Sequence, residues 1–238
     1  MIKFYKILRG VKLIILNSFY FKVKILGLKL ILLILTQGLI KFLFLKIKNK
    51  KISRKFYRYT RKFSFSENYF NHNSEIWFDI FEKNNCFNRK LTILEIGSFE
   101  GMSLLFFQYF LKVKDIFSVD FAKNKNFEKN IKNFKNVKYF NLKSDLFFRK
   151  NINHKFDIIY IDGSHYYKDV FNDLINSERK LKQDGLMIID DLLLDLNYRK
   201  KGMNFYEDVI GGVMMFLKEK KSKFKFLYVG HQLILKKI

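Results

Sequence analysis

Acidic side chains recur at the ends of short apolar segments in the second half of the chain. Asp120 and Asp162 each end such a segment, and the pair Asp190–Asp191 ends another. Two neighbouring carboxylates repel each other unless a positive charge joins them, which favours a bound cation beside this pair. His165, three residues after Asp162, has the side chain that most readily takes a proton near neutral pH. These residue types predict proton transfer assisted by a divalent ion.

Residues 95–103 read Glu-Ile-Gly-Ser-Phe-Glu-Gly-Met-Ser and have the features of a ligand-binding turn. Gly97 permits a tight turn, and Gly101 permits close approach of the backbone to a ligand. The spacing differs from the dinucleotide pattern G-x-G-x-x-G, and the Gly-Lys-Ser/Thr of a P-loop is missing. Asp120 follows Gly101 by 19 residues, where a carboxylate can accept from both hydroxyls of a ribose. The combination predicts a cofactor that contains a nucleoside.

Alternating apolar and amphipathic segments must position these residues. After Asn71, apolar runs typical of buried parallel strands alternate with segments typical of helices. The pattern predicts strands over 91–97, 115–120, 137–141, 156–162 and 186–191, helices over 101–113, 123–134, 166–182 and 205–218, and two last strands over 224–229 and 232–237. The expected fold is α/β: a doubly wound, mostly parallel seven-stranded sheet of Rossmann-like type with a C-terminal antiparallel hairpin. Ligands of such sheets bind beyond the carboxyl ends of the strands, where the acids lie.

Four segments carry a resemblance to a known family. They read E-I-G-S-F-E-G-M-S, S-V-D, F-D-I-I-Y-I-D-G-S-H-Y-Y and L-M-I-I-D-D. Together they resemble class I S-adenosylmethionine-dependent methyltransferases, and more narrowly methyltransferase family 24 and the macrocin-type O-methyltransferases near it. The resemblance covers residues 67–238, including Trp77 before the first strand and the final G-H-Q-L-I-L-K-K. Residues 1–64 have no recognised counterpart.

The resemblance implies a cofactor site for S-adenosylmethionine at the first strands. Glu95 would support the loop, Asp120 would hold the ribose hydroxyls, and Asp145 would lie near the adenine. The full set of implied cofactor-binding residues is Glu95, Gly97, Ser98, Gly101, Ser103, Asp120 and Asp145.

The resemblance also implies a metal site and a catalytic pair. Metal-using relatives hold Mg²⁺ through one acid after the fourth strand and an acid pair after the fifth, which here are Asp162, Asp190 and Asp191. A hard cation lowers the pKa of an acceptor hydroxyl, and an imidazole can take its proton. His165 and Asp162 are therefore the expected catalytic residues, although His165 could equally contact the substrate.

Other reactive residues are expected to have no catalytic role. His72, His154 and His231 lie outside these motifs and are predicted to be structural or solvent-facing, whereas Asp195 either extends the acidic cluster or begins a lid loop. A single cysteine, Cys86, excludes an intramolecular disulfide and a multi-cysteine zinc site. The sequence has no proline, which excludes the Asn/Asp-Pro-Pro-aromatic loop of enzymes that methylate exocyclic base nitrogens.

The positive charge is concentrated before the predicted enzyme domain. The formal net charge is +24, and residues 1–66 hold 17 basic residues without one Asp or Glu. This basic, apolar N-terminal helical segment would precede a methyltransferase domain over 67–238. Three interpretations stay open: a membrane-spanning helix over 25–45, an anchor on an anionic membrane surface through residues 1–62, and helices packed on the catalytic domain. Residues 46–62 are predicted to be a solvated basic linker or a lipid-headgroup contact.

The sequence therefore predicts a cytoplasmic, S-adenosylmethionine-dependent O-methyltransferase assisted by Mg²⁺, and leaves open whether it associates with the inner face of the cell membrane. Its acceptor would be a small molecule or a glycan. An RNA methyltransferase that uses the basic segment is one alternative, and a catalytically silent, membrane-associated module with the cofactor fold is another. Nucleic acid ranks lower as a partner, because the Lys, Asn, Ile and Phe excess is typical of an AT-rich genome.

Overall fold

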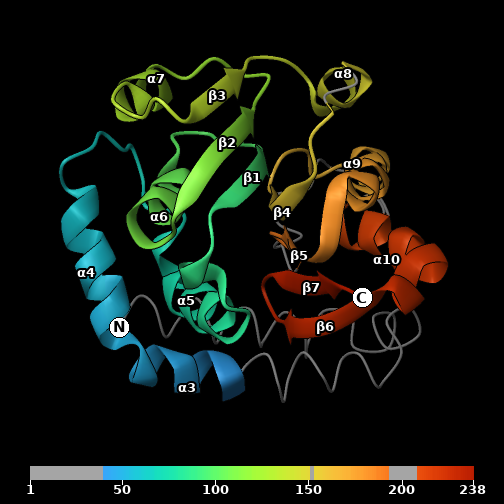
Figure 1. The fold of residues 1–238 in the computed structure, drawn as a ribbon, viewed down its shortest axis with the longest axis horizontal. Helices are drawn as coiled ribbons and strands as arrows, with labels where there is room; N and C mark the ends of the chain where they lie inside the picture. Colours follow the sequence, from blue (N-terminus) through green and yellow to red (C-terminus); the bar gives the residue numbers. More distant parts are fainter. Residues whose placement is uncertain (1–39, 151–152, 193–207) are drawn as a thin grey trace, which may run out of the picture.

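The computed structural model describes residues 40–150, 153–192 and 208–238, and a seven-stranded sheet lies at its centre (Figure 1). The strands are β1 (Leu91–Ile96), β2 (Val113–Val119), β3 (Val137–Phe140), β4 (Phe156–Ile161), β5 (Leu181–Ile189), β6 (Phe224–Val229) and β7 (Leu233–Lys237). Their order is β3-β2-β1-β4-β5-β7-β6. The first five pair in parallel, whereas β7 runs antiparallel to both β5 and β6. The predicted sheet and its C-terminal hairpin are confirmed.

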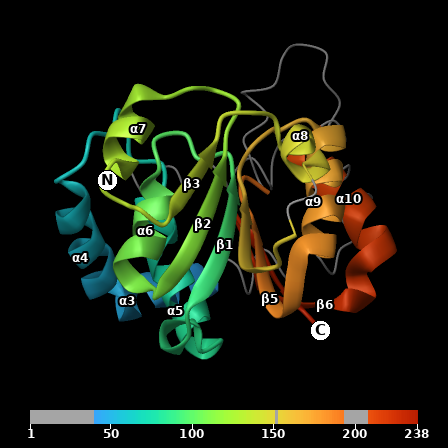
Figure 2. The ribbon, with the colours of Figure 1, turned by 45° about the horizontal axis from the view of Figure 1, so that its top comes forward.

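Helices cover both faces of the sheet, which is why its central strands are apolar throughout (Figure 2). One face packs against α5 (Ser74–Lys83), α6 (Met102–Phe110) and α7 (Lys125–Ile131), and the other against α8 (Ser144–Arg149), α9 (Tyr167–Lys180) and α10 (Val209–Lys220). Successive strand residues alternate between the two cores, as Ile93 and Leu94 do in β1. Short 3₁₀ turns are η2 (Asn71–Asn73), η3 (Cys86–Asn88) and η6 (Lys221–Lys223).

The register of the parallel strands brings their carboxyl ends to one edge. Ile96 of β1 is level with Ile161 of β4, which is level with Ile189 of β5. The next residues continue the ladder, because the Asp162 amide donates to the Ile96 carbonyl (2.8 Å) and the Asp190 amide to the Ile161 carbonyl (3.0 Å). The acids that follow these strands therefore share one edge of the sheet, as the sequence predicts.

Two details differ from the predicted elements. Strand β5 begins at Leu181, before Gly185, because residues around Asp184 (φ 60°) form an irregularity that the partner strand β4 does not match. Helix α8 was not predicted, since it has only six residues and too short an apolar pattern to detect.

Residues 46–62 are not a solvated linker, which corrects the sequence prediction. They belong mostly to α3 (Ile40–Lys48) and α4 (Lys50–Thr60), which pack beside α5 and α6. Phe56 of α4 is fully buried, and its ring lies 5.1 Å from Phe106 and 5.7 Å from Phe70, centroid to centroid. In the sequence, the many lysines around Phe56 make this segment look solvated, although one face of α4 is buried.

No helix within the described ranges combines the length and apolarity needed to cross a membrane. Most of the span predicted over 25–45 lies outside those ranges, and so does Asp195.

Candidate functional site

Residues 97–101, here called the glycine loop, connect β1 to α6. Gly97 has a φ of 83°, and a Cβ on it would lie 1.9 Å from the carbonyl oxygen of Asp162. Gly101 has a φ of 81° and immediately precedes α6, with the Phe127 ring 3.1 Å from where its Cβ would be. Both positions need glycine, because other residues rarely adopt such φ values. At Gly97 a Cβ would also collide with the Asp162 backbone. The loop therefore passes in direct contact with the residue that ends β4.

Asp120, which follows β2, holds the glycine loop in place. Its Oδ2 accepts from the backbone amides of Ser98 (3.0 Å) and Phe99 (2.9 Å), and its Oδ1 accepts from the Ala122 amide (2.9 Å). A carboxylate has about four lone-pair sites, so acceptor capacity remains for ligand hydroxyls. The structure thus brings Asp120 to the loop where the sequence predicts it, and a ribose-binding role stays a prediction.

Glu95 lies fully buried beneath the loop. Its Oε1 accepts a short hydrogen bond from the Ser103 hydroxyl, whereas its Oε2 has no hydrogen-bond partner among the described residues. Ser98 adds a second buried contact, because its hydroxyl lies 2.5 Å from that of Ser118. Burial raises the pKa of Glu95 to about 7. The unpaired Oε2 of Glu95 is a buried acceptor beneath a loop that has no room for a Cβ at Gly97. Such an acceptor suits a ligand that has hydrogen-bond donors.

Asp145 lies apart from these contacts. It is in the first turn of α8, and an ion pair joins it to Arg149 four residues later (3.5 Å). Two exposed aromatic side chains that sequence reasoning missed lie closer to the loop in the chain: Phe99 within it and Phe121 directly after Asp120, 49% and 73% exposed. An aromatic residue beside a predicted ribose-binding acid was the signal available for Phe121.

The second half of the site is the acid–histidine cluster, formed by Asp162, His165, Asp190, Asp191 and His231. Buried Tyr160 lies at its base, with its hydroxyl 2.9 Å from Asp162 Oδ2 and 2.5 Å from Asp190 Oδ2. One hydroxyl has one proton, so it cannot donate to both carboxylates at the same time. Burial and the nearby charges of Asp190 and Asp191 raise the pKa of Asp162 well above its ordinary value.

Asp191 joins two histidines. Its Oδ2 lies 3.2 Å from His165 Nε2 and its Oδ1 lies 3.0 Å from His231 Nε2. Its φ of 52° is unusual for a residue other than glycine and turns the chain just after β5. Although burial disfavours its charge, the hydrogen bonds from both imidazoles hold the pKa of Asp191 below its ordinary value. The hydrogen bond between His165 and Asp191 also raises the pKa of His165, which makes this imidazole a stronger base.

A layer of neutral groups orients the cluster from behind. Gln232 donates from Nε2 to Asp190 Oδ2 (2.7 Å) and accepts at Oε1 from the indole of Trp77 (2.8 Å). The backbone amide of Asp191 donates to Asp190 Oδ1 (2.8 Å). Asp190 therefore has its carboxylate plane fixed by three donors, including Tyr160.

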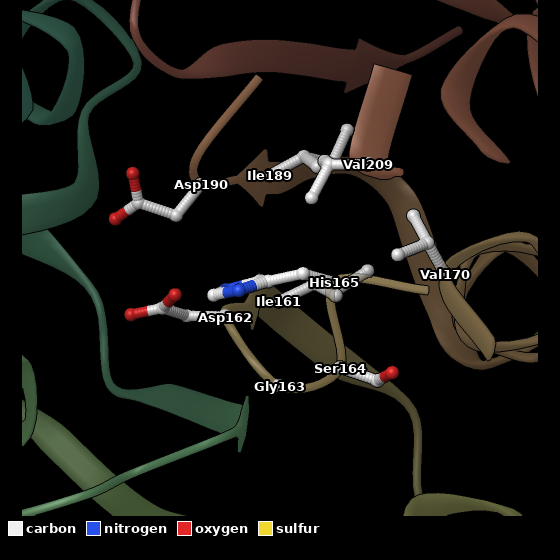
Figure 3. Close-up of a pocket in the computed structure, with 9 residues that line it drawn as sticks. All are labelled: Ile161, Asp162, Gly163, Ser164, His165, Val170, Ile189, Asp190 and Val209. Carbon is white, nitrogen blue, oxygen red and sulfur yellow. The ribbon is translucent and has the colours of Figure 1, made fainter. Parts of the chain in front are cut away.

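Figure 3 shows the mouth of this cluster as a small pocket between the ends of β4 and β5 and the helices α9 and α10. The His165 ring lies between the side chains of Asp162 and Asp190. Val170 and Val209 form an apolar wall at the other end of the pocket. Charged and apolar groups thus meet where an acceptor molecule could lie beside the acids.

The cluster has the donor set of a cation site. Within the described residues, two groups of three have ligand atoms within 4.8 Å of one another: Asp162, His165 and Asp191, and Asp190, Asp191 and His231. Carboxylate oxygens suit divalent cations, and imidazole nitrogen suits the transition ions among them. The residues present therefore fit a divalent ion, with Asp191 common to both groups.

His231, predicted to be structural or solvent-facing, lies within the acid–histidine cluster with its side chain partly exposed. The residue lies in the turn between β6 and β7, and β7 pairs with β5, so the turn reaches the acids at the end of β5. His72 packs its ring against His231 (5.5 Å between centroids), whereas His154 lies against Phe117 (4.8 Å). Gln232 and Tyr160 were also missed. The strand order, which places β7 beside β5, was the information that could have revealed His231 and Gln232.

Comparison with known sequences gives a family match. Residues 94–192 match the model of methyltransferase family 24, described as a methyltransferase domain. An uncharacterized protein of Acanthamoeba polyphaga mimivirus is 26% identical over 178 residues, which are 69% of this chain and 79% of that protein. The matched range contains the glycine loop, Asp120 and every member of the acid–histidine cluster except His231.

Comparison with solved structures shows the same fold. The MycE methyltransferase from the mycinamycin biosynthetic pathway, in complex with Mg, SAH and mycinamycin VI, is 17% identical with a TM-score of 0.53; the match covers 79% of this chain and 53% of MycE. A putative caffeoyl-CoA O-methyltransferase from Staphylococcus aureus has 16% identity and a TM-score of 0.55, over 83% and 99%. The Bacillus cereus O-methyltransferase in complex with SAH has 12% identity and a TM-score of 0.54, over 79% and 91%. The chain thus spans about half the length of MycE.

Proposed function

We propose that this chain, which is a class I S-adenosylmethionine-dependent methyltransferase, methylates a hydroxyl group of a small molecule or sugar with the help of a divalent cation. The observation that carries the proposal is the contact between the two halves of the site. Gly97 packs on the Asp162 carbonyl, so a cofactor on the glycine loop would lie beside the acid–histidine cluster. O-methyltransferases among the similar structures, and the Mg and mycinamycin VI bound to MycE, support this choice of acceptor and ion.

The glycine loop supplies the cofactor half. We assign Asp120 to the ribose hydroxyls, because its carboxylate keeps acceptor capacity beyond its three backbone donors. Phe121, exposed beside it, offers an aromatic face to the adenine. Glu95 and Ser103 support the loop from below. Asp145 remains a weaker assignment, since its ion pair is with Arg149.

The acid–histidine cluster supplies the base. Bound S-adenosylmethionine would provide an electrophilic methyl group on sulfur, and a bound divalent ion would lower the pKa of an acceptor hydroxyl. His165 Nε2 faces Asp191 Oδ2 (3.2 Å) and would donate to it, so His165 would take the hydroxyl proton at Nδ1 and Asp191 would stabilise the resulting imidazolium. Asp162, Asp190 and Asp191 would hold the ion, and the apolar wall of Val170 and Val209 would help exclude water.

Cofactor binding is tested by calorimetry with S-adenosylmethionine on the full chain. Asp120→Ala should weaken binding at least tenfold, because the variant loses both the ribose acceptor and the fixed loop. Asp115→Ala is the matched control, since this acid lies at the other end of β2 in an ion pair with Lys138 (3.0 Å) and should change affinity less than twofold. Unchanged affinity in Asp120→Ala would contradict the cofactor assignment.

The acceptor class is tested by transfer of a labelled methyl group. Sugars, small alcohols and phenols, lipids and RNA are offered in parallel, and NMR of the product identifies the methylated atom. We expect O-methylation of a small molecule or sugar, and a His165→Ala variant should lose most of the rate while keeping cofactor affinity. Methylation of RNA alone would instead favour the reading in which the basic N-terminal segment recruits nucleic acid.

A second proposal concerns location, and one observation favours it. Helix α3 exposes Ile40, Leu43, Phe44 and Ile47, which lie at positions i, i+3, i+4 and i+7 and thus on one face of the helix. Neither α3 nor α4 contains an acidic residue, and Lys41, Lys46 and Lys48 flank the apolar face. We propose that this face lies on the anionic inner surface of a membrane, so that the enzyme works at the cytoplasmic side.

Flotation with vesicles tests this location. Wild-type chain should float with vesicles that contain phosphatidylserine, an anionic lipid of the cytoplasmic leaflet, whereas Phe44→Ser/Ile47→Ser should remain at the bottom. Leu146→Ser is the control, because Leu146 is an exposed apolar residue (46%) on another helix, α8. Equal flotation of all three proteins would contradict a role for α3. Point variants are preferable to truncation, since removal of α4 would expose the core around Phe56.

A further inference from the structure

The acid–histidine cluster holds more nitrogen than an Mg²⁺ site needs. We infer that His231, rather than Asp162, completes the metal site with Asp190 and Asp191, and that this site takes a divalent first-row transition ion in preference to Mg²⁺. The inference rests on the divalent-ion assistance proposed above. It changes the ligand set from three carboxylates to two carboxylates and one imidazole.

The distances fit one ion between these three side chains. His231 Nε2 lies 3.0 Å from Asp191 Oδ1 and 3.7 Å from Asp190 Oδ1. Neighbouring ligands around an ion with bonds of about 2.1 Å lie roughly 3 Å apart in an octahedral shell. The three atoms therefore need little movement to become adjacent ligands, once the proton on His231 Nε2 has left.

The surroundings of Asp190 are those of an oriented metal ligand. Ligating carboxylates are usually fixed by hydrogen bonds from a second layer of residues. Asp190 Oδ2 accepts from Gln232 and from Tyr160, and Gln232 is itself held by Trp77. Among the described residues, Asp190 Oδ1 accepts a hydrogen bond from the Asp191 amide alone and keeps a lone pair toward His231. The layer thus leaves one oxygen of the buried acid directed at the proposed ion.

Backbone contacts fix His231 against the same strand end. The Leu192 amide, next to Asp191, donates to the His231 carbonyl (2.8 Å), and the Gly230 amide donates to the Gln232 carbonyl (2.9 Å). The turn between β6 and β7 and the end of β5 are therefore one rigid unit. His231 reaches the acids from a turn that lies far from them in the chain, which is typical of a built site.

The alternative group of Asp162, His165 and Asp191 suits catalysis better than ligation. Asp162 lies against the glycine loop through its own backbone, and its Oδ2 is the more distant of the two carboxylate oxygens beside the Tyr160 hydroxyl (2.9 Å). His165 lines the pocket mouth, where an acceptor hydroxyl would approach. With His231 as the ligand, the His165 ring stays available to take a proton. Two histidines on one carboxylate can thus have different tasks.

Imidazole changes which ions bind. Mg²⁺ prefers oxygen ligands and keeps several waters, whereas Fe²⁺, Co²⁺ and Zn²⁺ bind imidazole nitrogen well. Removal of the imidazole should therefore weaken a transition ion much more than Mg²⁺. This difference separates a ligand from a residue that only supports the site.

Titration with Co²⁺, followed by visible absorption and calorimetry, tests the inference on the full chain. We expect Co²⁺ to bind wild type at least tenfold more tightly than Mg²⁺. His231→Ala should weaken Co²⁺ at least tenfold and Mg²⁺ less than threefold, and His165→Ala should change either affinity less than threefold. His154→Ala is the matched control, because this ring packs on Phe117 away from the site.

Several outcomes would overturn the inference. They are equal affinity of wild type for Co²⁺ and Mg²⁺, loss of Co²⁺ binding in His165→Ala but not in His231→Ala, or no binding of either ion. A measurement on wild type alone guards against a misfolded variant: coordinated imidazole should give a paramagnetically shifted, exchangeable N–H proton in the NMR spectrum with Co²⁺. Absence of that signal also overturns it. Affinity for S-adenosylmethionine, measured separately, shows whether the methyltransferase assignment stands when the ion assignment fails.

Discussion

The two halves of the site are built on different principles. The glycine loop is held by hydrogen bonds between one side chain and nearby backbone amides, those of Ser98, Phe99 and Ala122 to Asp120. The acid–histidine cluster is held by side chains that bond to one another across β4, β5 and the turn before β7. In the first half, backbone amides fix the loop around a single carboxylate. In the second half, three carboxylates lie close to two imidazoles.

The two halves therefore differ in what holds them: backbone geometry in the glycine loop, and charge in the acid–histidine cluster. Backbone amides do not change their protonation, so the donors that hold the glycine loop are constant, and the buried Glu95 beneath them, with a pKa of about 7, is the titrating group of this half. The cluster depends on shared protons, because Tyr160 has one proton for two acids and Asp191 has two imidazoles. We therefore expect changes in the loop to act through shape, and changes in the cluster to act through pH and bound ions.

The largest effect is expected from Gly97→Ala. A Cβ at this position would lie 1.9 Å from the Asp162 carbonyl, and the φ of 83° adds strain. We expect a loss of about 3 kcal/mol or more in the free energy of unfolding and at least a hundredfold loss of cofactor affinity. Denaturant unfolding and calorimetry measure both. Gly163→Ala is the control, since its Cβ would lie 3.1 Å from the Ile96 Cγ2 and no closer than 3.8 Å to backbone atoms; equal behaviour of the two variants would refute the shape argument.

Asp191→Asn should give the next largest effect, on catalysis. Asp191 raises the pKa of His165, so the neutral base predominates only above that raised value and the rate falls as the pH drops through it. Without this charge, the acid limb of kcat/KM should move to lower pH while the maximum falls about a hundredfold. Asp169→Asn is the control, because Asp169 accepts from Ser164 (2.7 Å) nearby. A profile that keeps its acid limb would show that Asp191 does not act on His165.

Asp162→Asn should stabilise the ion-free protein. Burial and neighbouring acids raise the pKa of Asp162 in the folded state, so the folded state binds this proton more tightly than the unfolded state. The contribution of Asp162 to the free energy of unfolding is therefore fully present below its ordinary, unfolded-state pKa. It is lost as the pH rises through its raised, folded-state pKa. Asparagine mimics the protonated acid, and we expect the Tm to rise by about 2–4 °C at pH 8 with little change near pH 4. Thermal unfolding at both pH values checks this, and a uniform shift would contradict it.

Ser98→Ala should have the smallest effect. The change removes the contact with the Ser118 hydroxyl but leaves the backbone bonds from residues 98 and 99 to Asp120. We expect a loss of about 1 kcal/mol in stability and less than a threefold change in cofactor affinity. A tenfold loss of affinity would show that the loop depends on its side chains after all, and would weaken the comparison.

Much of the fold and the site could be predicted because local signals agreed with the tertiary structure. Apolar runs ended in acids or glycine at β1, β2, β4 and β5, and parallel strands bring their ends to one edge. This reasoning brought Asp120 to the glycine loop and Asp162, Asp190 and Asp191 to one cluster. Their roles in binding and catalysis remain predictions.

What the sequence did not reveal depends on contacts between distant segments. His231 reaches Asp191 only because β7 inserts beside β5, and no local pattern around residues 230–232 indicates that pairing. Phe56 is buried because α4 meets the aromatic side chains of α6, while the lysines around it indicate a solvated segment. Strand order and helix docking decide both cases, and neither is a property of a short window of sequence.

The insertion of β7 has a consequence for the order in which the protein can assemble. Ribosomes make β6 before β7, yet β6 lies at the edge of the sheet and pairs only with β7. Strand β6 must therefore wait for a later segment before it can join, whereas the glycine loop can form as soon as β1, β2 and β4 are out. The acids at the end of β5 meet Gln232 and His231 only in that last step. In a nascent chain halted before residue 231, the glycine loop could already have formed. The acids at the end of β5 would still lack their contacts with His231 and Gln232, which would leave a negatively charged edge that a chaperone could protect.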